Sequence, residues 1–222
     1  MRPTRRAGRP LPRRFYARDA VSVARAILGR LLVHDTPAGR ISGVVVEAEA
    51  YRGSRDPASH AYRGRTPRNA TMFGRPGHAY VYFTYGMHHC LNLVTGREGT
   101  AAAVLVRALE PVDGVALMRA RRGGPAGDAR LARGPGNVAR CLGLTREHDG
   151  LDLTHGPLWL SDAPARRHGR RIASGPRVGI RVGLEHRWRF FLGGHPCVSA
   201  ARGPAALRSR SRPRRSGTRR VG

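Results

Sequence analysis

The run VVVEAEAY, residues 44–51, places two carboxylates within an apolar, β-branched stretch. Such a run predicts a strand, and because side chains alternate along a strand, Glu47, Glu49 and Tyr51 share one face while the alanines between them share the other. An ionised carboxylate that is partly buried loses hydration and requires a charged or hydrogen-bonding partner. The pattern fits a general base, and it also fits a pair of structural carboxylates neutralised by arginines.

Arg107 lies within a second apolar, strand-like run, residues 103–109. A guanidinium that points inward from such a strand requires an anion. We expect Arg107 to pair with Glu49 or Glu47, which would keep that carboxylate ionised and fix a water beside it, as a hydrolytic base requires. A purely structural ion pair is the alternative.

The charge of the chain points to a polyanionic partner. All 41 basic residues are arginines, and only 14 acidic residues oppose them, which gives a net charge of +27 over 222 residues. Such a field attracts nucleic acid through counterion release. The length suits a single domain, which we expect at 15–202. We expect residues 1–14 and 203–222, which are rich in Arg and Pro, to be disordered basic tails.

Other sequence features concern location and cofactors. The three cysteines are widely spaced, which excludes a CxxC metal motif and argues against a disulfide framework. The ten histidines show no spacing typical of a zinc or iron site, so we expect no cofactor and no metal. Because we find neither an apolar run of membrane-spanning length nor a signal-peptide pattern, we expect a cytoplasmic, nucleoid-associated bacterial protein that does not bind membranes. We expect a monomer.

Two strand-like runs, residues 78–84 and 88–94, flank a Tyr85-Gly86 turn and predict a β-hairpin. An exposed ring at a hairpin tip in a cationic protein suits insertion between DNA base steps, although ordinary turn chemistry also explains it. Tyr51, His60 and Tyr82 would form a stacking box for an extruded base. Simple packing explains each of these three residues when it is taken alone.

The remaining segments give local predictions. The stretch at 52–76 is a long loop of the kind that often carries function. A Gly-Pro-Gly sequence precedes one predicted helix, where it either aims N–H groups at a phosphate or simply starts the helix. The spacing of apolar, capping and proline residues predicts helices at 20–31, 111–119 and 134–142, and short strands at 177–182 and 188–192.

Several of these segments together resemble the alkyladenine (3-methyladenine) DNA glycosylase family. The resemblance covers Phe15 to Ser199, in the family's order and approximate spacing, and is carried by VVVEAEAY, SHAYRGRTPRNATMF, GHAYVYFTYGMHHCLN, VLVRALEP, GPGNVARCLGL and PRVGIRVGLEHRWRFF. It implies an α+β fold, in which a single mixed domain has a curved, largely antiparallel sheet, flanking helices and a protruding β-hairpin that inserts into DNA.

The resemblance also implies roles for the residues of the site. Glu49 would be the general base that activates water, and Arg107 would help to position that water. Tyr51, His60 and Tyr82 would sandwich the damaged base.

Further roles concern base selection and the duplex. Asn92 would discriminate against the 2-amino group of normal guanine, Tyr85 would replace the flipped nucleotide in the stack, and Met87 would lie beside it in the duplex. Two departures from the family pattern are Asn137, where many members have lysine, and His186-Arg187-Trp188, which lacks a proline that often precedes the aromatic-Arg-Phe signature. His88 and His89 also stand where other members often have aromatic rings.

The sequence therefore predicts a monofunctional DNA glycosylase of base excision repair, which flips damaged purines out of double-stranded DNA and leaves an abasic site. The resemblance implies 3-methyladenine as a substrate, and it alone extends the range to hypoxanthine and ethenoadenine. With no lysine in the chain, no side-chain amine is present to form a Schiff base, so strand cleavage is not expected. The alternatives are a non-catalytic basic nucleic-acid-binding module of the same fold and a basic RNA-associated protein.

Overall fold

The predicted acidic strand is the centre of the sheet. In the computed structural model, which describes residues 8–84 and 86–199, it is β2 (Gly39–Arg52), a strand of 14 residues. One edge of β2 pairs with β5 (Ala102–Asp113), and the other pairs first with β1 (Leu31–Thr36) and then with β8 (Arg189–Leu192). β2 therefore has neighbours on both edges, and its residues 41–50 are all buried.

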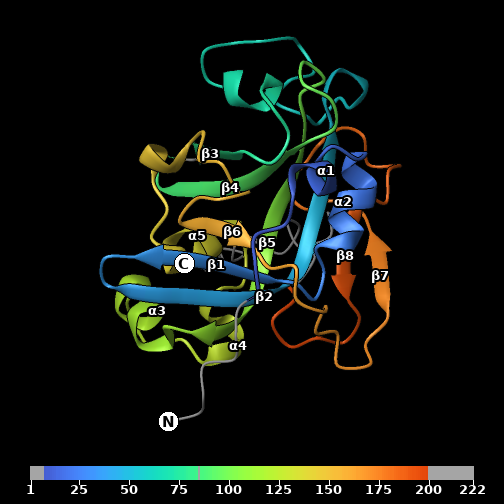
Figure 1. Cartoon of the computed structure of the whole chain (residues 1–222). Coiled ribbons are helices and arrows are strands. Elements are labelled where there is room, and N and C mark those ends of the chain that lie inside the picture. Colours follow the sequence, from blue (N-terminus) through green and yellow to red (C-terminus); the bar gives the residue numbers. More distant parts are fainter. Residues whose placement is uncertain (1–7, 85, 200–222) are drawn as a thin grey trace, which may run out of the picture.

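The sheet is antiparallel and curved (Figure 1). Within the described part of the chain, eight strands form it in the order β3-β4-β5-β2-β1-β6, and β7 pairs with β8. The pairing of β2 with β5 shifts register on either side of Glu47, and such bulges bend a strand. The α+β fold is confirmed. The strands not yet given are β3 (Ala79–Thr84), β4 (His88–Thr95), β6 (Leu158–Leu160) and β7 (Ile172–Gly175).

Short helices pack against this sheet. The carboxylate of Asp19 caps α2 by accepting the N–H of Val21 at 3.0 Å, and α2 ends at Ala26, earlier than predicted, because Gly29 has a φ of +85°. Among the described residues, no helix has the length and apolar character that crossing a membrane demands. The helices are α1 (Arg13–Tyr16), α2 (Ala20–Ala26), α3 (Val115–Arg122), α4 (Asp128–Leu131) and α5 (Pro135–Leu142), with 3-10 turns η1 (Gly53–Arg55), η2 (Ala70–Phe73) and η3 (Arg146–His148).

Two predicted elements are wrong. Pro111 does not start a helix, because it lies in β5 opposite Gly43, next to a register shift of the kind that tolerates proline, and α3 begins only at Val115. Residues 177–182 do not form a strand. Gly179 has a φ of +80°, and the preceding N–H donates to a side chain instead of a neighbouring strand.

Packed structure begins before Phe15, the predicted start of the domain. The N–H of Leu11 donates to the carbonyl of Leu160 in β6, and the Leu11 side chain is buried. Arg13 forms an ion pair with Asp152. The composition of residues 8–14 resembles that of a tail, but these contacts fix them against the sheet. The rest of the predicted tails lies outside the described residues.

The predicted long loop, residues 52–76, folds over the end of the sheet at η1 and η2. Its Ala61 and Met72 join a small second core with residues of β3, β4 and β5. The buried amide of Asn69 donates to the carbonyls of His60 and Gly64. The loop is therefore held in one conformation, with His60 fixed against β3.

Candidate active site

Glu47 and Glu49 lie on one face of β2, as predicted, and both are fully buried. Arg107 of β5 lies against both of them. Its Nε donates to Oε1 of Glu47 at 3.1 Å, and its Nη1 donates to Oε2 of Glu49 at 3.3 Å. The sequence left open which carboxylate Arg107 would pair with, and the structure shows that it pairs with both.

Two further donors surround the carboxylate of Glu49. The hydroxyl of Tyr51 donates to Oε2 at 2.9 Å, and the backbone N–H of Val178 donates to Oε1 at 2.7 Å. A carboxylate has about four acceptor positions, so these bonds and the one from Arg107 leave one position on Oε1 for a water. Burial raises the pKa of Glu49 above its ordinary value, while Arg107, the Val178 N–H and the Tyr51 hydroxyl oppose that rise.

Glu47, Glu49 and Arg107 form an ion network in which Glu47 has two further partners that the sequence analysis did not predict. Its Oε1 accepts from Nε of Arg189 at 2.7 Å, and its Oε2 accepts from the N–H of Ser199 at 2.7 Å. One buried carboxylate thus faces two buried guanidinium groups. Arg189 begins the apolar strand β8. An arginine in an apolar strand is the signal that indicated Arg107, so the same signal was available for Arg189.

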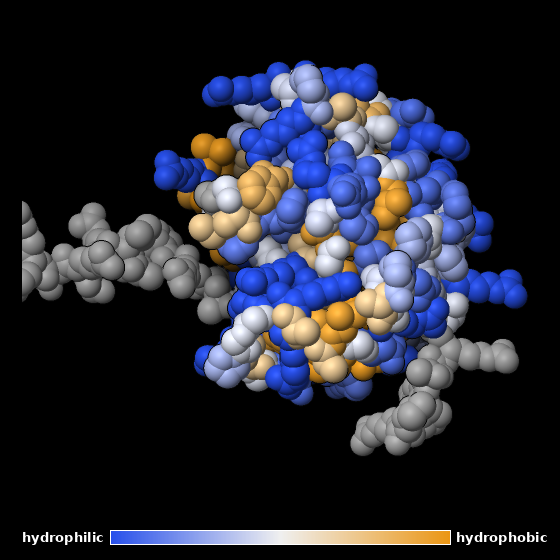
Figure 2. Space-filling model, turned by 90° about the vertical axis from the view of Figure 1, so that its left-hand side faces the viewer, coloured by the Kyte–Doolittle hydropathy of each residue, from blue (hydrophilic) through white to orange (hydrophobic). Residues whose placement is uncertain are grey.

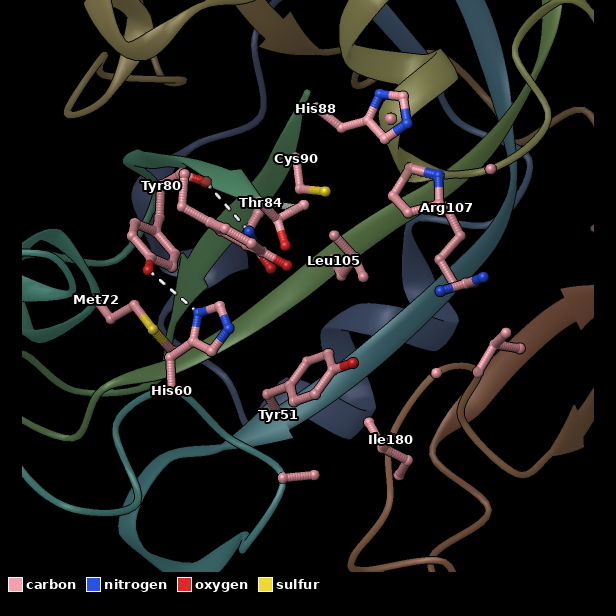
Figure 3. A pocket seen from close by; sticks show the side chains of 18 of the residues that line it. Tyr51, His60, Met72, Tyr80, Thr84, His88, Cys90, Leu105, Arg107 and Ile180 are labelled. Atoms are coloured by element: carbon pink, nitrogen blue, oxygen red, sulfur yellow. Dashed lines mark hydrogen bonds between the residues drawn. The ribbon is translucent and has the colours of Figure 1, made fainter. Parts of the chain in front are cut away.

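A cavity of about 790 Å³ opens beside the ion network (Figure 3). Glu49 lies directly behind its wall, since all three of its hydrogen-bond donors line the cavity. The predicted residues Tyr51, His60, Tyr82, Asn92 and Arg107 are therefore brought together. Other lining residues, which sequence reasoning missed, include Met72, Tyr80, Cys90, Leu105 and Val178 to Val182.

Aromatic rings form one side of the cavity. The ring of His60 meets that of Tyr82 edge-on, with centroids 4.5 Å apart, and its Nδ1 lies 3.3 Å from the hydroxyl of Tyr80. Burial lowers the pKa of His60, which favours the neutral ring at pH 7, and burial raises the pKa of Tyr82. The buried amide of Asn92 donates to the carbonyl of Tyr80 at 3.2 Å, which fixes its orientation.

The start of α5 closes the opposite side of the cavity. Its Gly-Pro-Gly sequence lines the cavity together with Asn137 and His88. A Cβ on Gly136 would lie 2.9 Å from the ring of His88, so only glycine permits this packing. The side chain of Asn137 donates to the carbonyl of Arg133 at 2.7 Å, which directs it toward the segment that precedes α5.

The β3–β4 hairpin borders the cavity on the outside. Its strands pair from Ala79 with Leu93 to Thr84 with His88, which confirms the predicted hairpin. Met87, beside the turn, is 68% exposed, while Tyr85 lies outside the described residues.

Figure 2 shows that hydrophilic side chains dominate the face of the molecule that it presents, with hydrophobic ones scattered among them.

Across residues 8–84 and 86–199, no three or more His, Cys, Asp or Glu side chains are grouped in a way that would bind a metal ion. The carboxylates of the ion network, Glu47 and Glu49, are paired with arginines.

Comparison with known proteins agrees with this geometry. The sequence model of the methylpurine-DNA glycosylase family matches residues 14–196. The chain belongs to this family. A Streptomyces avermitilis protein named provisionally as a 3-methyladenine DNA glycosylase is 49% identical over 91% of this chain and 96% of its own length. A relative with the same provisional name from Burkholderia lata is 48% identical over 90% of this chain and 95% of its own length. Another from Methanocella arvoryzae is 45% identical over 85% of this chain and 95% of its own length.

Proposed function

We propose that this methylpurine-DNA glycosylase family member hydrolyses the N-glycosidic bond of alkylated purines in double-stranded DNA and leaves an abasic site. The observation that carries the proposal is the buried carboxylate of Glu49, directly behind the wall of a cavity lined by aromatic rings. The net charge of +27 supports DNA as the substrate, because it favours binding to phosphates.

Glu49 would act as the general base. Cleavage of an N-glycosidic bond develops positive charge on the sugar, and a nearby carboxylate stabilises that charge. A water on the remaining acceptor position of Oε1 would attack C1′ and give its proton to Glu49, while the bonding electrons leave with the base. Arg107, which donates to Oε2 of Glu49, would hold the carboxylate and the water in place.

The cavity favours bases that leave without protonation. Burial lowers the pKa of His60 and raises the pKa values of Tyr51 and Tyr82, so none of these groups readily gives up a proton at pH 7. An alkylated purine that is already cationic needs no such donor. We therefore expect 3-methyladenine to be released faster than the neutral lesions hypoxanthine and ethenoadenine.

The target base would reach the cavity by flipping out of the duplex. Stacking on an aromatic ring contributes ~1–3 kcal/mol per base, which Tyr51, His60 and Tyr82 would supply. We propose that Tyr85 fills the vacated position in the duplex, and the exposure of the neighbouring Met87 supports insertion of this hairpin tip into the minor groove.

The deciding experiment compares wild type with Glu49→Gln on duplexes that contain 3-methyladenine, 7-methylguanine or hypoxanthine. Free base is measured under single-turnover conditions, and DNA binding is measured separately. The matched control is Glu98→Gln, the same chemical change at an exposed position. We expect release by wild type and the control, none by Glu49→Gln, and equal binding by all three. Binding without release by wild type would favour the non-catalytic module.

A second test concerns the fate of the abasic site. A glycosylase that also cuts the strand forms a Schiff base with an amine, and this chain has no lysine. We expect borohydride to trap no covalent complex between the protein and damaged DNA. Trapped complex would contradict the monofunctional mechanism, once a variant with a blocked N-terminal amine shows that this amine is not responsible.

A further inference from the structure

A second carboxylate–arginine pair lies beside the ion network of Glu49. Asp56 follows η1 and Arg177 precedes Val178, and both side chains are fully buried. The guanidinium donates from Nη1 to Oδ2 of Asp56 at 2.5 Å and from Nη2 to Oδ1 at 2.8 Å. Because two charges without water are costly even when paired, a bidentate pair at this depth calls for a specific explanation.

Arg177 contacts the residues that hold Glu49. Its guanidinium lies over the ring of Tyr51, 4.7 Å from the centroid, and over the ring of Trp188, 5.2 Å from the centroid. It also donates to the carbonyl of Ala50, between Glu49 and Tyr51, at 3.1 Å. The ring that supplies one donor to Glu49 is therefore fixed on one face by Arg177.

The second donor depends on Arg177 through the backbone. The N–H of Val178, which immediately follows Arg177, donates to Oε1 of Glu49 at 2.7 Å. Residues 177–182 belong to no strand, so no ladder of hydrogen bonds holds this segment in place. The two bonds from Arg177 to Asp56 and the one to Ala50 take that role.

We propose that Asp56 and Arg177 form a positioning pair that holds the Tyr51 hydroxyl and the Val178 N–H against Glu49. The proposal rests on the proposed function, in which Glu49 is the base. Neither member of the pair contacts the carboxylate of Glu49. They act on Glu49 through its two donors: Arg177 stacks on the ring of Tyr51, and it is the residue before Val178 in the chain.

Asp56 extends the same support to the aromatic wall of the cavity. Its carboxylate accepts the N–H groups of Arg52 at 3.2 Å and Ala58 at 3.1 Å, and so orders the turn that leads to His60. The pair thus joins the end of β2, the loop that carries His60 and the segment that carries Val178. These three segments meet at the cavity from distant parts of the sequence.

The test measures the titration of Glu49 with and without the pair. The chain has six glutamates, so labelling their carboxyl carbons with ¹³C gives few signals, and Glu49→Gln identifies the signal of Glu49. The variants are Asp56→Asn, Arg177→Met and the double variant, which removes both charges together. Asp152→Asn, which breaks the partly exposed ion pair with Arg13, is the matched control.

Loss of the two donors removes stabilisation of the ionised form of Glu49, so its titration midpoint should rise by about one pH unit. The acid limb of single-turnover base release should move by the same amount, with release falling about tenfold on that limb. Removing one partner leaves a buried charge, so the single variants should also lose stability. The double variant should recover stability in urea unfolding and still show the raised midpoint.

A pair that only neutralises charge gives a different result. In that case the double variant restores both stability and the midpoint of Glu49, and the proposal is overturned. It is also overturned if the midpoint does not rise in any folded variant, or rises equally in Asp152→Asn. A wild type that releases no base refutes the proposed function instead, and the carboxyl titration still decides whether the pair holds the two donors.

Discussion

The change from Glu47 to Gln tests the ion network behind the cavity. Glu47 is fully buried and accepts hydrogen bonds from Arg107, Arg189 and the N–H and hydroxyl of Ser199. Glutamine keeps the shape of the side chain but removes the charge that two guanidinium groups face. The NH₂ group of glutamine is itself a donor, and it would face another donor, because every partner of Glu47 in this network donates a hydrogen bond to it.

The expected loss of stability follows from the cost of an unpaired buried charge. Breaking a buried pair costs about 3–5 kcal/mol, and we expect about 3 kcal/mol because glutamine retains one acceptor oxygen. With a urea dependence of about 2 kcal/mol/M, the unfolding midpoint falls by about 1.5 M. A domain with a stability in the usual range of about 5–15 kcal/mol would remain folded in water.

The same variant should shift the pH dependence of base release in the opposite direction to loss of Asp56 or Arg177. The negative charge of Glu47 raises the pKa of Glu49, and Arg107 divides its hydrogen bonds between the two carboxylates. With Glu47 neutral, the pKa of Glu49 falls, so the acid limb moves to lower pH.

Urea unfolding at pH 7 and single-turnover rates between pH 4 and pH 8 measure both effects, with exposed Glu98→Gln as the control. A destabilisation below about 1 kcal/mol would refute the argument that Glu47 compensates two buried charges. An acid limb that moves to higher pH would refute the argument that Glu47 opposes the ionisation of Glu49.

Four further predictions follow from the site and the charge. In wild type, base release should rise with pH through a midpoint above the ordinary pKa of glutamate, about 4.3, because protonated Glu49 accepts no proton; a midpoint at or below that value contradicts this. Asn92→Ser should allow measurable release of guanine from undamaged duplex, and unchanged discrimination would remove Asn92 from that role. Truncation after Arg202 removes seven arginines, so the slope of log affinity against log salt should flatten by up to about 6, with single-turnover rates unchanged; a slower chemical step contradicts an electrostatic role. Treatment with EDTA should leave base release unchanged, and its loss would show a metal requirement.

Local sequence patterns were sufficient for the two strands that carry the ion network. Alternation along residues 44–51 placed Glu47 and Glu49 on one face, and a lone arginine in an apolar strand gave Arg107 as their partner. Both inferences need only the two-residue period of a strand and the cost of a buried charge. The hairpin was predicted for the same reason, since its two strands are close in sequence.

The sequence pattern failed where contacts are distant in the chain. Val178 reaches Glu49 across 129 residues and Arg177 reaches Asp56 across 121 residues. The β-branched residues of 177–182 have the composition of a strand, so they were assigned to one. Two buried carboxylates override that preference: Glu49 accepts a hydrogen bond from the N–H of Val178, and Asp56 accepts two from the side chain of Arg177. Neither contact can be inferred from the sequence of the segment itself.

The use of arginine alone connects the interior of the protein with its surface. In the described part of the chain, Glu47, Glu49 and Asp56 are the carboxylates with no exposed surface, and each is bonded to at least one arginine. A buried lysine readily loses its proton, whereas a guanidinium stays charged and offers several donors in a fixed plane. Arginine can therefore hold these acids inside the domain at neutral pH. Because each of these acids is paired with an arginine, their charges largely cancel, and the positive field of the remaining arginines is available for DNA phosphates.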